Sequence, residues 1–146
     1  MQPDLFSGIQ AADGEAIDLS LPVLSILQPW ATSIVCGLKD VENRTWPTRV
    51  RGRVLIHAGK RRSLNELMSW QQLRKARGIE DKMGRHWNDL EFGGIIGMAE
   101  IVDCVEELDS PWFTGPFGFV LRNARPLPFY PCKGKLGFFR VRKEAL

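Results

Sequence analysis

Short apolar runs, separated by glycine, proline and charged residues, recur along the chain and predict a fold rich in β-strands. Glycines at positions 93, 94 and 97 indicate a bend or bulge in one of these strands, as in a sheet that curls. The proline-rich link Pro126–Pro131 predicts an extended path between the last two strands. Six strands are expected, at residues 24–27, 39–46, 53–58, 94–104, 117–122 and 136–142.

Two segments carry helical signals. A short helix is predicted over residues 30–36, because Pro29 suits the first turn of a helix and Gly37 suits its left-handed end. The capping-box pattern Ser63-x-x-Glu66 predicts the start of a longer helix, and apolar positions recur at helical spacing to about Ala76. The glycine-rich, charged stretch at residues 78–92 has no such period and is expected to be a loop.

The order of these elements decides the fold class. A short helix after the first strand and a longer helix after the third do not alternate as a parallel α/β sheet requires. The pattern favours an α+β fold, a small curled β-barrel of antiparallel or mixed strands with helices at its ends. At 146 residues the chain has room for one domain, which we assign to residues 22–146. Residues 1–21 are expected to be a poorly ordered lead-in that contacts the barrel through Leu5 and Phe6.

Composition is that of an ordinary globular protein. Apolar residues make up 44% of the chain, and no apolar stretch has the length that crosses a bilayer. We therefore expect no membrane contact, and the absence of a signal pattern at the N-terminus predicts a cytoplasmic location. Three cysteines without CxxC spacing, and only two histidines, predict neither a zinc site nor a disulfide, and no cofactor is expected.

The net charge of +3 is too small to indicate nucleic-acid binding by itself, because the field of a protein depends on how its charges cluster. Basic residues do cluster, with few acids among them, in residues 44–53, 60–62 and 133–143. The pattern is consistent both with unrelated solvated faces and with a surface that binds phosphate groups.

The segment at residues 39–46 has the least ordinary composition, because five of its eight side chains are charged or carry an amide. Glu42 and Arg44 are two residues apart, so on a strand they project from one face and either pair or converge on a ligand. Lys39 lies at the junction between the short helix and this strand. A solvated edge strand is the simpler interpretation, and a ligand site is the other. In either case we expect Glu42 to be an ionised partner of its cationic neighbours.

Three motifs occur in order along the chain: L-S-I-x-Q-P-W-A from Leu24, G-x-K-x-x-E-x-R-x-W from Gly37 and R-G-x-V-x-I-H-A from Arg51. Together with later glycine and proline blocks they resemble the ASCH domain, the activating-signal-cointegrator homology family of the PUA-like superfamily. The resemblance covers roughly residues 24–141. It implies a small β-barrel with a cleft that binds RNA or nucleotides. In some relatives that cleft hydrolyses the amide of N4-acetylcytidine or cleaves RNA.

The resemblance also implies candidate catalytic residues. In the amidohydrolase relatives the motif after the short helix resembles G-x-K-x-x-T, with the lysine and the threonine catalytic. Lys39 matches the lysine, whereas Glu42 stands in the threonine position and removes the hydroxyl. A different chemistry remains open, in which Glu42 activates water and Lys39 stabilises the oxyanion. The carboxylate that completes the relatives' site has three candidates here, Glu100, Glu106 and Glu107.

Candidate ligand-binding residues surround this pair. Arg44 is suited to a phosphate, because a guanidinium binds one with two hydrogen bonds. Aromatic rings stack on bases, and the candidates for that role are Trp30, Trp46 and Trp112. Proline and polar residues adjoin Trp46 and Trp112, which suggests that these two lie at the rim of the cleft. His57 and Lys60, at the end of a buried strand and just beyond it, are candidates for the cleft wall and for a phosphate contact.

The sequence therefore predicts binding of RNA or of a modified nucleoside or nucleotide. The alternatives are an amidohydrolase acting on N4-acylated cytidine or a related amide, a ribonuclease, and an adaptor that contacts a protein partner. Whether the protein is an enzyme stays open at this point, since Lys39 and Glu42 suit binding as well as catalysis.

Overall fold

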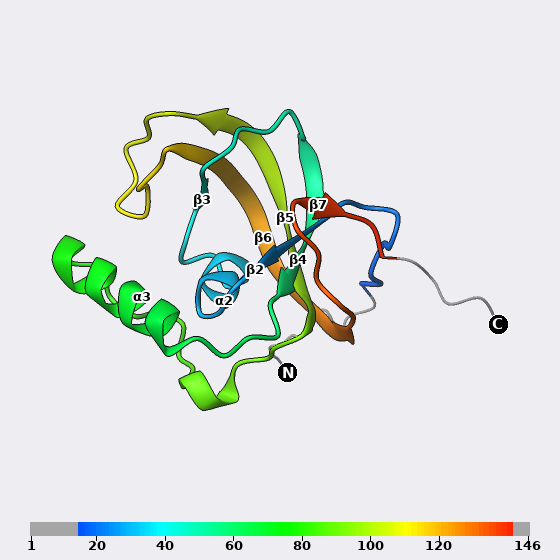
Figure 1. Cartoon of the computed structure of the whole chain (residues 1–146), viewed down its shortest axis with the longest axis horizontal. Coiled ribbons are helices and arrows are strands. Elements are labelled where there is room, and N and C mark those ends of the chain that lie inside the picture. Colours follow the sequence, from blue (N-terminus) through cyan, green and yellow to red (C-terminus); the bar gives the residue numbers. More distant parts are fainter. Residues whose placement is uncertain (1–14, 142–146) are drawn as a thin grey trace.

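A computed structural model describes residues 15–141 (Figure 1). Residues 1–14, with Leu5 and Phe6 and most of the predicted lead-in, lie outside the described part. The remainder of that lead-in lies against the barrel, because Ile17, Leu19 and Leu21 pack on its core. The boundary between residues 21 and 22 stays a prediction.

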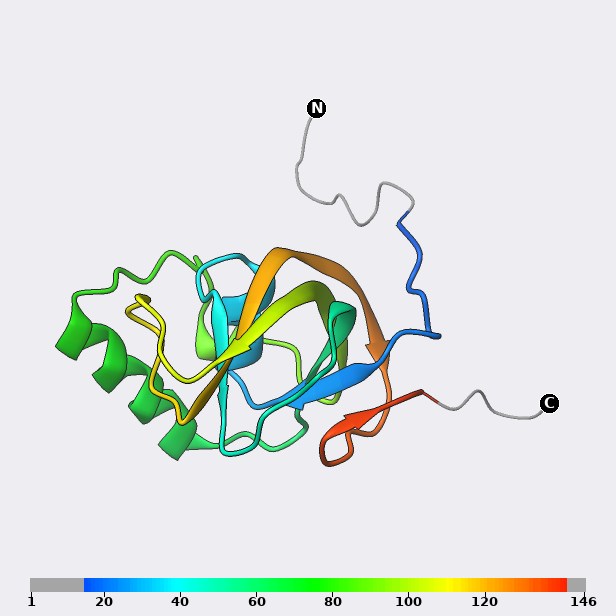
Figure 2. The same ribbon diagram turned by 90° about the horizontal axis from the view of Figure 1, so that it is seen from above.

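Within the described residues, six strands form one curled sheet, in the order β3-β6-β5-β4-β2-β7 (Figures 1 and 2). Only the β2–β4 pair is parallel among the strand pairs of residues 15–141. The sheet confirms the predicted α+β fold with a curled, mixed barrel. The strands are β2 (Val23–Ile26), β3 (Val41–Arg44), β4 (Gly52–Ala58), β5 (Gly94–Val105), β6 (Phe117–Pro131) and β7 (Phe138–Phe139).

The two predicted helices are present where the sequence places them. Helix α2 (Trp30–Val35) follows β2 and lies inside the curve of the sheet, and Gly37 turns the chain out of it with a φ of 84° (Figure 2). Helix α3 (Leu64–Arg77) follows β4, and the hydroxyl of its cap Ser63 accepts a hydrogen bond from the backbone N–H of Glu66. The stretch at residues 78–92 is a loop with one short 3₁₀ helix, η1 (Trp87–Asp89).

Alternating side chains bury both faces of the central strands, as expected for a sheet covered on two sides. On β4, Val54 and Ile56 face α2 in one core, whereas Leu55 faces a second core on the other side of the sheet. The second core is closed by residues 17–21 and by the chain around Phe139. The curvature therefore holds α2 in the middle of the fold and fixes the turn that follows it.

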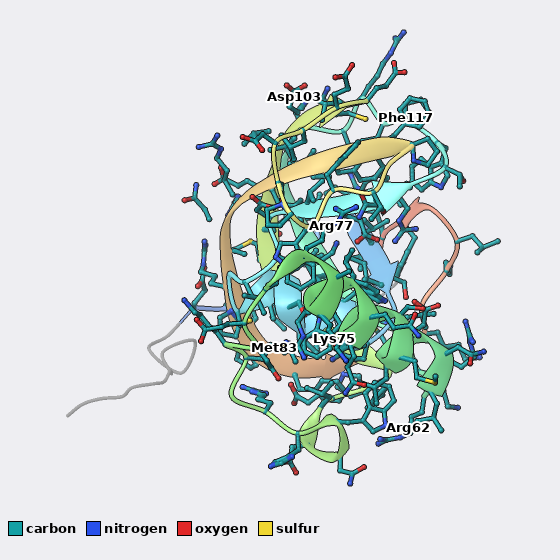
Figure 3. The ribbon with its side chains drawn as sticks, turned by 90° about the vertical axis from the view of Figure 1, so that its left-hand side faces the viewer. Arg62, Lys75, Arg77, Met83, Asp103 and Phe117 are labelled. Carbon is teal, nitrogen blue, oxygen red and sulfur yellow. The ribbon has the colours of Figure 1, made fainter. Side chains whose placement is uncertain are left out.

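A third, smaller core joins α3 to the rest of the molecule. Trp70 on α3 packs with Val41 and Trp112, and its indole N–H donates to the hydroxyl of Ser33 on α2 at 2.9 Å. At the other end of α3, Arg77 donates to two carbonyl groups of the loop that joins β5 to β6 (Figure 3). Helix α3 therefore lies beside β3 and the end of α2, where the charged segment at residues 39–46 is found.

Two strand predictions were wrong in their limits. The strand expected to end at Arg122 continues through the prolines to Pro131. Prolines are tolerated there because, among residues 15–141, β3 pairs only with residues 117–120 of β6. In this part of the chain the second half of β6 is therefore an edge, where a missing N–H costs little. The strand expected over residues 136–142 forms only at Phe138 and Phe139, which pair with β2.

Close approach between α2 and β5 depends on Gly97. A Cβ atom at this position would lie 2.5 Å from a Val35 methyl carbon and 2.5 Å from the carbonyl oxygen of Arg125. No side chain fits at these distances unless the helix or β6 moves.

We predict that Gly97→Ala lowers the free energy of unfolding by about 1–3 kcal/mol, because overpacking a filled core forces neighbours apart. Val102→Ala is the matched control, since Val102 lies on the same strand with 40% of its surface exposed and its loss should change stability by less than about 0.5 kcal/mol. Urea unfolding of both variants measures the difference. If Gly97→Ala were as stable as Val102→Ala, then α2 and β6 could move apart without lowering the free energy of unfolding.

Candidate functional site

The turn between α2 and β3 presents the charged side chains. The backbone N–H of Lys39 donates to the carbonyl oxygen of Ser33 at 2.8 Å, which ties the turn to the helix. Strand β3 then pairs with β6, so Glu42 and Arg44 extend from a fixed backbone. Rigid elements on both sides therefore hold the segment that the sequence singled out.

Lys39 is almost fully buried, with 2% of its surface exposed. Its ammonium group donates to the carbonyl oxygen of Val41 and, at 3.3 Å, to Oε1 of Glu42. It also lies 5.6 Å from the centre of the Trp30 ring. Burial lowers the pKa of Lys39 below its ordinary value, and the carboxylate of Glu42 opposes that shift. A lysine this deeply buried is rare, and its charge requires the partner that Glu42 provides.

Glu42 connects Lys39 to Arg44. Its Oε2 accepts a hydrogen bond from Nε of Arg44 at 2.9 Å, while its Oε1 accepts the bond from Lys39. Arg44 also donates from Nη2 to the carbonyl oxygen of Ser25 on β2, at 2.9 Å. The three charged side chains thus form one row, cation, carboxylate, cation, as the expected pairing of Glu42 requires.

This row lies in a cavity of about 350 Å³, which we call the inner cavity. Trp30 and Glu66 line it from the two helices, and Asn43 and Thr114 line it from β3 and from the loop before β6. The cavity holds two cations, Lys39 and Arg44, and two carboxylates, Glu42 and Glu66. The cavity therefore combines balanced charges with apolar surface, which suits a neutral ligand with hydrogen-bond donors and acceptors better than an anion.

Sequence reasoning missed several members of the inner cavity, among them Glu66, Asn43 and Thr114. Glu66 was interpreted only as a helix-capping residue, yet its carboxylate accepts the indole N–H of Trp30 at 2.8 Å. Asn43 holds the loop before β6, because its amide nitrogen donates to the carbonyl oxygen of Trp112 and its oxygen accepts the N–H of Thr114. The one sequence signal for this contact was the amide side chain of Asn43, which lies between Glu42 and Arg44 in the sequence.

The three candidate tryptophans have different environments. Trp30 lines the inner cavity, and its ring meets that of Trp112 edge to face at 6.4 Å. Trp112 itself is a core residue with 3% of its surface exposed, so the interpretation of it as a rim residue that stacks on a base was wrong. Trp46 packs between Phe119 and Phe138 and does not line the inner cavity, although the guanidinium of Arg44 lies 5.8 Å from the centre of its ring. The neighbouring prolines and polar residues suggested a rim, but contacts distant in the chain cover Trp112 and partly cover Trp46.

His57 and Lys60 line a different, larger cavity of about 960 Å³, which we call the outer cavity. His57 is buried, and its Nε2 is 2.8 Å from the carbonyl oxygen of Cys132. A carbonyl only accepts, so Nε2 carries the hydrogen and Nδ1 accepts from the hydroxyl of Ser25 at 2.8 Å. Ser25 and Arg44 line both cavities, which makes the two spaces neighbours.

The three acidic candidates from the sequence lie away from the inner cavity. Glu100 is on β5, opposite Arg53 and Arg122 of the neighbouring strands. Glu106 and Glu107 follow the end of β5, and Glu107 lines a separate shallow hollow. The inner cavity instead has a second carboxylate, Glu66, which α3 contributes.

A curled mixed sheet that encloses a short helix, with a polar cavity between that helix and an edge strand, defines a PUA-like barrel. The ASCH domain family matches residues 24–115, and the chain belongs to this family. It is 30% identical to human activating signal cointegrator 1 and 38% identical to the mouse protein, each over an alignment of 124 residues that covers 76% of this chain. The chain spans 20% of the length of these relatives.

Solved structures show the same fold. A crystal structure of ASCH from Zymomonas mobilis has a TM-score of 0.53 and 16% sequence identity, and the match covers 86% of this chain and 90% of that one. A mutant form of the same bacterial protein has a TM-score of 0.50 at 18% identity, covering 88% of this chain and 92% of that one. These likenesses confirm the predicted barrel.

Two further observations concern residues 15–141 as a whole. None of their helices combines the length and the apolar character that crossing a bilayer demands. In the same residues, no three histidine, cysteine, aspartate or glutamate side chains gather closely enough to hold a metal ion.

We predict a pH effect from His57. Burial lowers the pKa of His57 below its usual value of 6.5, so the folded protein resists a proton that the unfolded chain accepts. The stability contributed by neutral His57 is present above pH 6.5 and is lost as the pH falls through the folded-state pKa. The free energy of unfolding should therefore decrease between about pH 7 and pH 5.

His57→Asn should flatten this pH dependence, which denaturant unfolding at several pH values measures. His86→Asn is the matched control, because His86 is exposed and is the other of the two histidines in the chain. If the free energy of unfolding of His57→Asn depended on pH as it does in the wild-type chain, carboxyl groups and not His57 would cause the loss of stability in acid.

Proposed function

We propose that this chain binds a single nucleobase of RNA, or a modified nucleoside, in the inner cavity. The observation that carries the proposal is the convergence of the Lys39–Glu42–Arg44 row with the Trp30 ring on one small cavity. Ligand cavities in proteins span about 300–1,000 Å³, so a space of about 350 Å³ suits one base or nucleoside and no longer segment.

The chemistry of the walls supports a base. Nucleobases carry donors and acceptors on their edges and an apolar face on each side, and proteins recognise unstacked bases through both. Glu42 and Glu66 offer carboxylate acceptors for an exocyclic amino group, and Lys39 uses two of its three N–H groups within the described residues. Trp30 offers an aromatic ring that Trp112 and Glu66 hold in place.

Family membership supports the same conclusion at a coarser level, since the ASCH domain resemblance implies RNA or nucleotide ligands. The curated relatives are much longer than this chain, so their activities as whole proteins are not transferred to it. The nucleobase proposal rests on the cavity.

Hydrolysis of an N4-acylated cytidine is the second candidate, and one observation favours it. Burial lowers the pKa of Lys39, as a catalytic lysine requires. Against it, Glu42 replaces the family's threonine, and each of its two oxygens is held in an ion pair. Thr114 lines the cavity and carries a hydroxyl, but it belongs to the loop before β6 and not to the motif after α2.

We predict that Trp30→Leu weakens nucleoside binding roughly 5- to 150-fold, which corresponds to the loss of one aromatic stack of about 1–3 kcal/mol. Isothermal titration with cytidine, uridine, adenosine and guanosine measures this change. Trp87→Leu is the matched control, because Trp87 lines neither the inner nor the outer cavity and its loss should leave the nucleoside affinity unchanged.

Thermal unfolding of both variants shows whether each remains folded. An equal loss of affinity in folded Trp30→Leu and Trp87→Leu would contradict binding in the inner cavity.

We predict that N4-acetylcytidine is bound without conversion to cytidine, because the hydroxyl of the hydrolytic motif is absent at position 42 and Glu42 is fully paired. Chromatography of the incubated nucleoside measures conversion. Turnover by the wild-type chain that is abolished in Lys39→Met, while Lys60→Met retains it, would establish the amidohydrolase function instead.

A further inference from the structure

The outer cavity differs from the inner cavity in its charge. Its lining residues include four cations, Arg44, Lys60, Lys133 and Lys135, and none of its lining residues is an aspartate or glutamate. Among residues 15–141, none of the three lysines forms an ion pair. The guanidinium of Arg62, 4.0 Å from the centre of the Phe92 ring, adds positive charge at its wall. This space therefore suits an anion.

The loop at residues 133–137 also offers backbone donors. Within the described part of the chain, none of its N–H groups donates to another backbone group. Gly137 has a φ of 67°, and a Cβ atom at Gly134 would lie 2.8 Å from both His57 and Ser25, so only a glycine allows the loop to lie directly on them. Glycine-containing loops with successive free N–H groups and nearby lysines bind phosphates in many proteins.

The loop is anchored at both ends, so its donors are fixed in place. The carbonyl oxygen of Cys132 accepts from His57, and the N–H of Cys132 donates to the carbonyl oxygen of Gly93 at 3.2 Å. At its other end the loop enters β7, which pairs with β2. Figure 1 shows this segment beside β2 and β4, on the side of the barrel away from α3.

The position and walls of the outer cavity define the kind of anion. Arg44 lies between the two cavities, and with Nε bound to Glu42 and Nη2 bound to Ser25 its Nη1 has no partner among the described residues. Phe92 and the fully exposed Leu136 add apolar surface, which suits the sugar of an organic phosphate better than inorganic phosphate. A strand whose base occupies the inner cavity would bring its neighbouring phosphates to the outer one.

We propose that the outer cavity binds the phosphodiester groups next to the recognised base, so that the ligand is a single-stranded oligonucleotide. This inference rests on the proposed function of the inner cavity, because the position of the base there determines which phosphates lie at the outer cavity. The lysines of the loop and Lys60 contact phosphates, and Arg44 lies between base and backbone.

The test compares a nucleoside, the corresponding nucleoside monophosphate and a pentanucleotide RNA of the same base, with the wild-type chain and with the double variant Lys133→Gln, Lys135→Gln. We expect affinity to rise from nucleoside to pentanucleotide. In the double variant the salt dependence of pentanucleotide binding, the slope of log K against log salt concentration, should fall by about 0.7 for each lysine removed. Nucleoside affinity should stay unchanged.

The double variant Lys75→Gln, Lys82→Gln is the matched control. It removes the same charge from exposed lysines on α3 and in the loop at residues 78–92, outside both cavities (Figure 3 shows Lys75). It should leave the slope unchanged. An equal fall in slope for the two double variants would overturn the inference, because it would show diffuse attraction without a phosphate site.

The outcomes separate this inference from the proposed function. Nucleoside binding that depends on Trp30, with no gain from added phosphates, would overturn the outer site and leave the inner site intact. Pentanucleotide binding that depends on Lys133 and Lys135 but not on Trp30 would support the outer site and overturn the inner one. A pentanucleotide DNA that binds as tightly as the RNA would support recognition of the phosphodiester, whereas binding of neither strand would overturn it.

Discussion

The cost of burying the Lys39 ammonium constrains the whole site. A charge held away from water needs a partner and filled hydrogen bonds, and losing that partner in a protein interior is strongly destabilising. Glu42 supplies the partner, Arg44 neutralises the remaining oxygen of Glu42, and Ser25 on β2 fixes Arg44. The turn after α2, the edge strand β3 and the first strand of the barrel are therefore joined through one row of charges. The inner cavity is the space along this row that α3 and the loop before β6 enclose.

In the binding mode that we propose, the two cavities have different roles because their charges differ. Cations and carboxylates are equal in number around the inner cavity, so hydrogen bonding and ring contact dominate there. Around the outer cavity the cations have no acidic counterparts, so attraction falls steeply with salt and carries little information about the base. Because Ser25 and Arg44 belong to both, a change at either residue is expected to affect selectivity and general affinity together. Variants limited to Trp30 or to the loop lysines separate the two effects more cleanly.

Local chemistry made most of the fold predictable. Gly37, Ser63 and the apolar runs act through short-range rules, so the helices and the succession of strands along the chain follow from the sequence. The grouping of Lys39, Glu42 and Arg44 follows from it as well. The wrong predictions concern positions whose structure is determined by segments distant in the chain. Trp112 is buried because α2 and α3 pack on it, and β6 continues through its prolines because β3 leaves that edge free. The second role of Glu66 depends on Trp30, thirty-six positions away in the chain, which no local pattern indicates.

Within residues 15–141, strand β3 has no partner close to it in sequence, since Val41 to Arg44 pair with Val120 to Phe117. The parallel β2–β4 pair can form early, whereas β3, which carries Glu42 and Arg44, can pair only after β6 has been synthesised. Non-local pairings of this kind slow folding, because a long loop must close before the contacts form. On the ribosome, where the N-terminal part of a chain emerges first, the charged segment would leave the tunnel long before its sheet partner. The wall of the inner cavity that β3 forms is thus completed only after β6 has been synthesised.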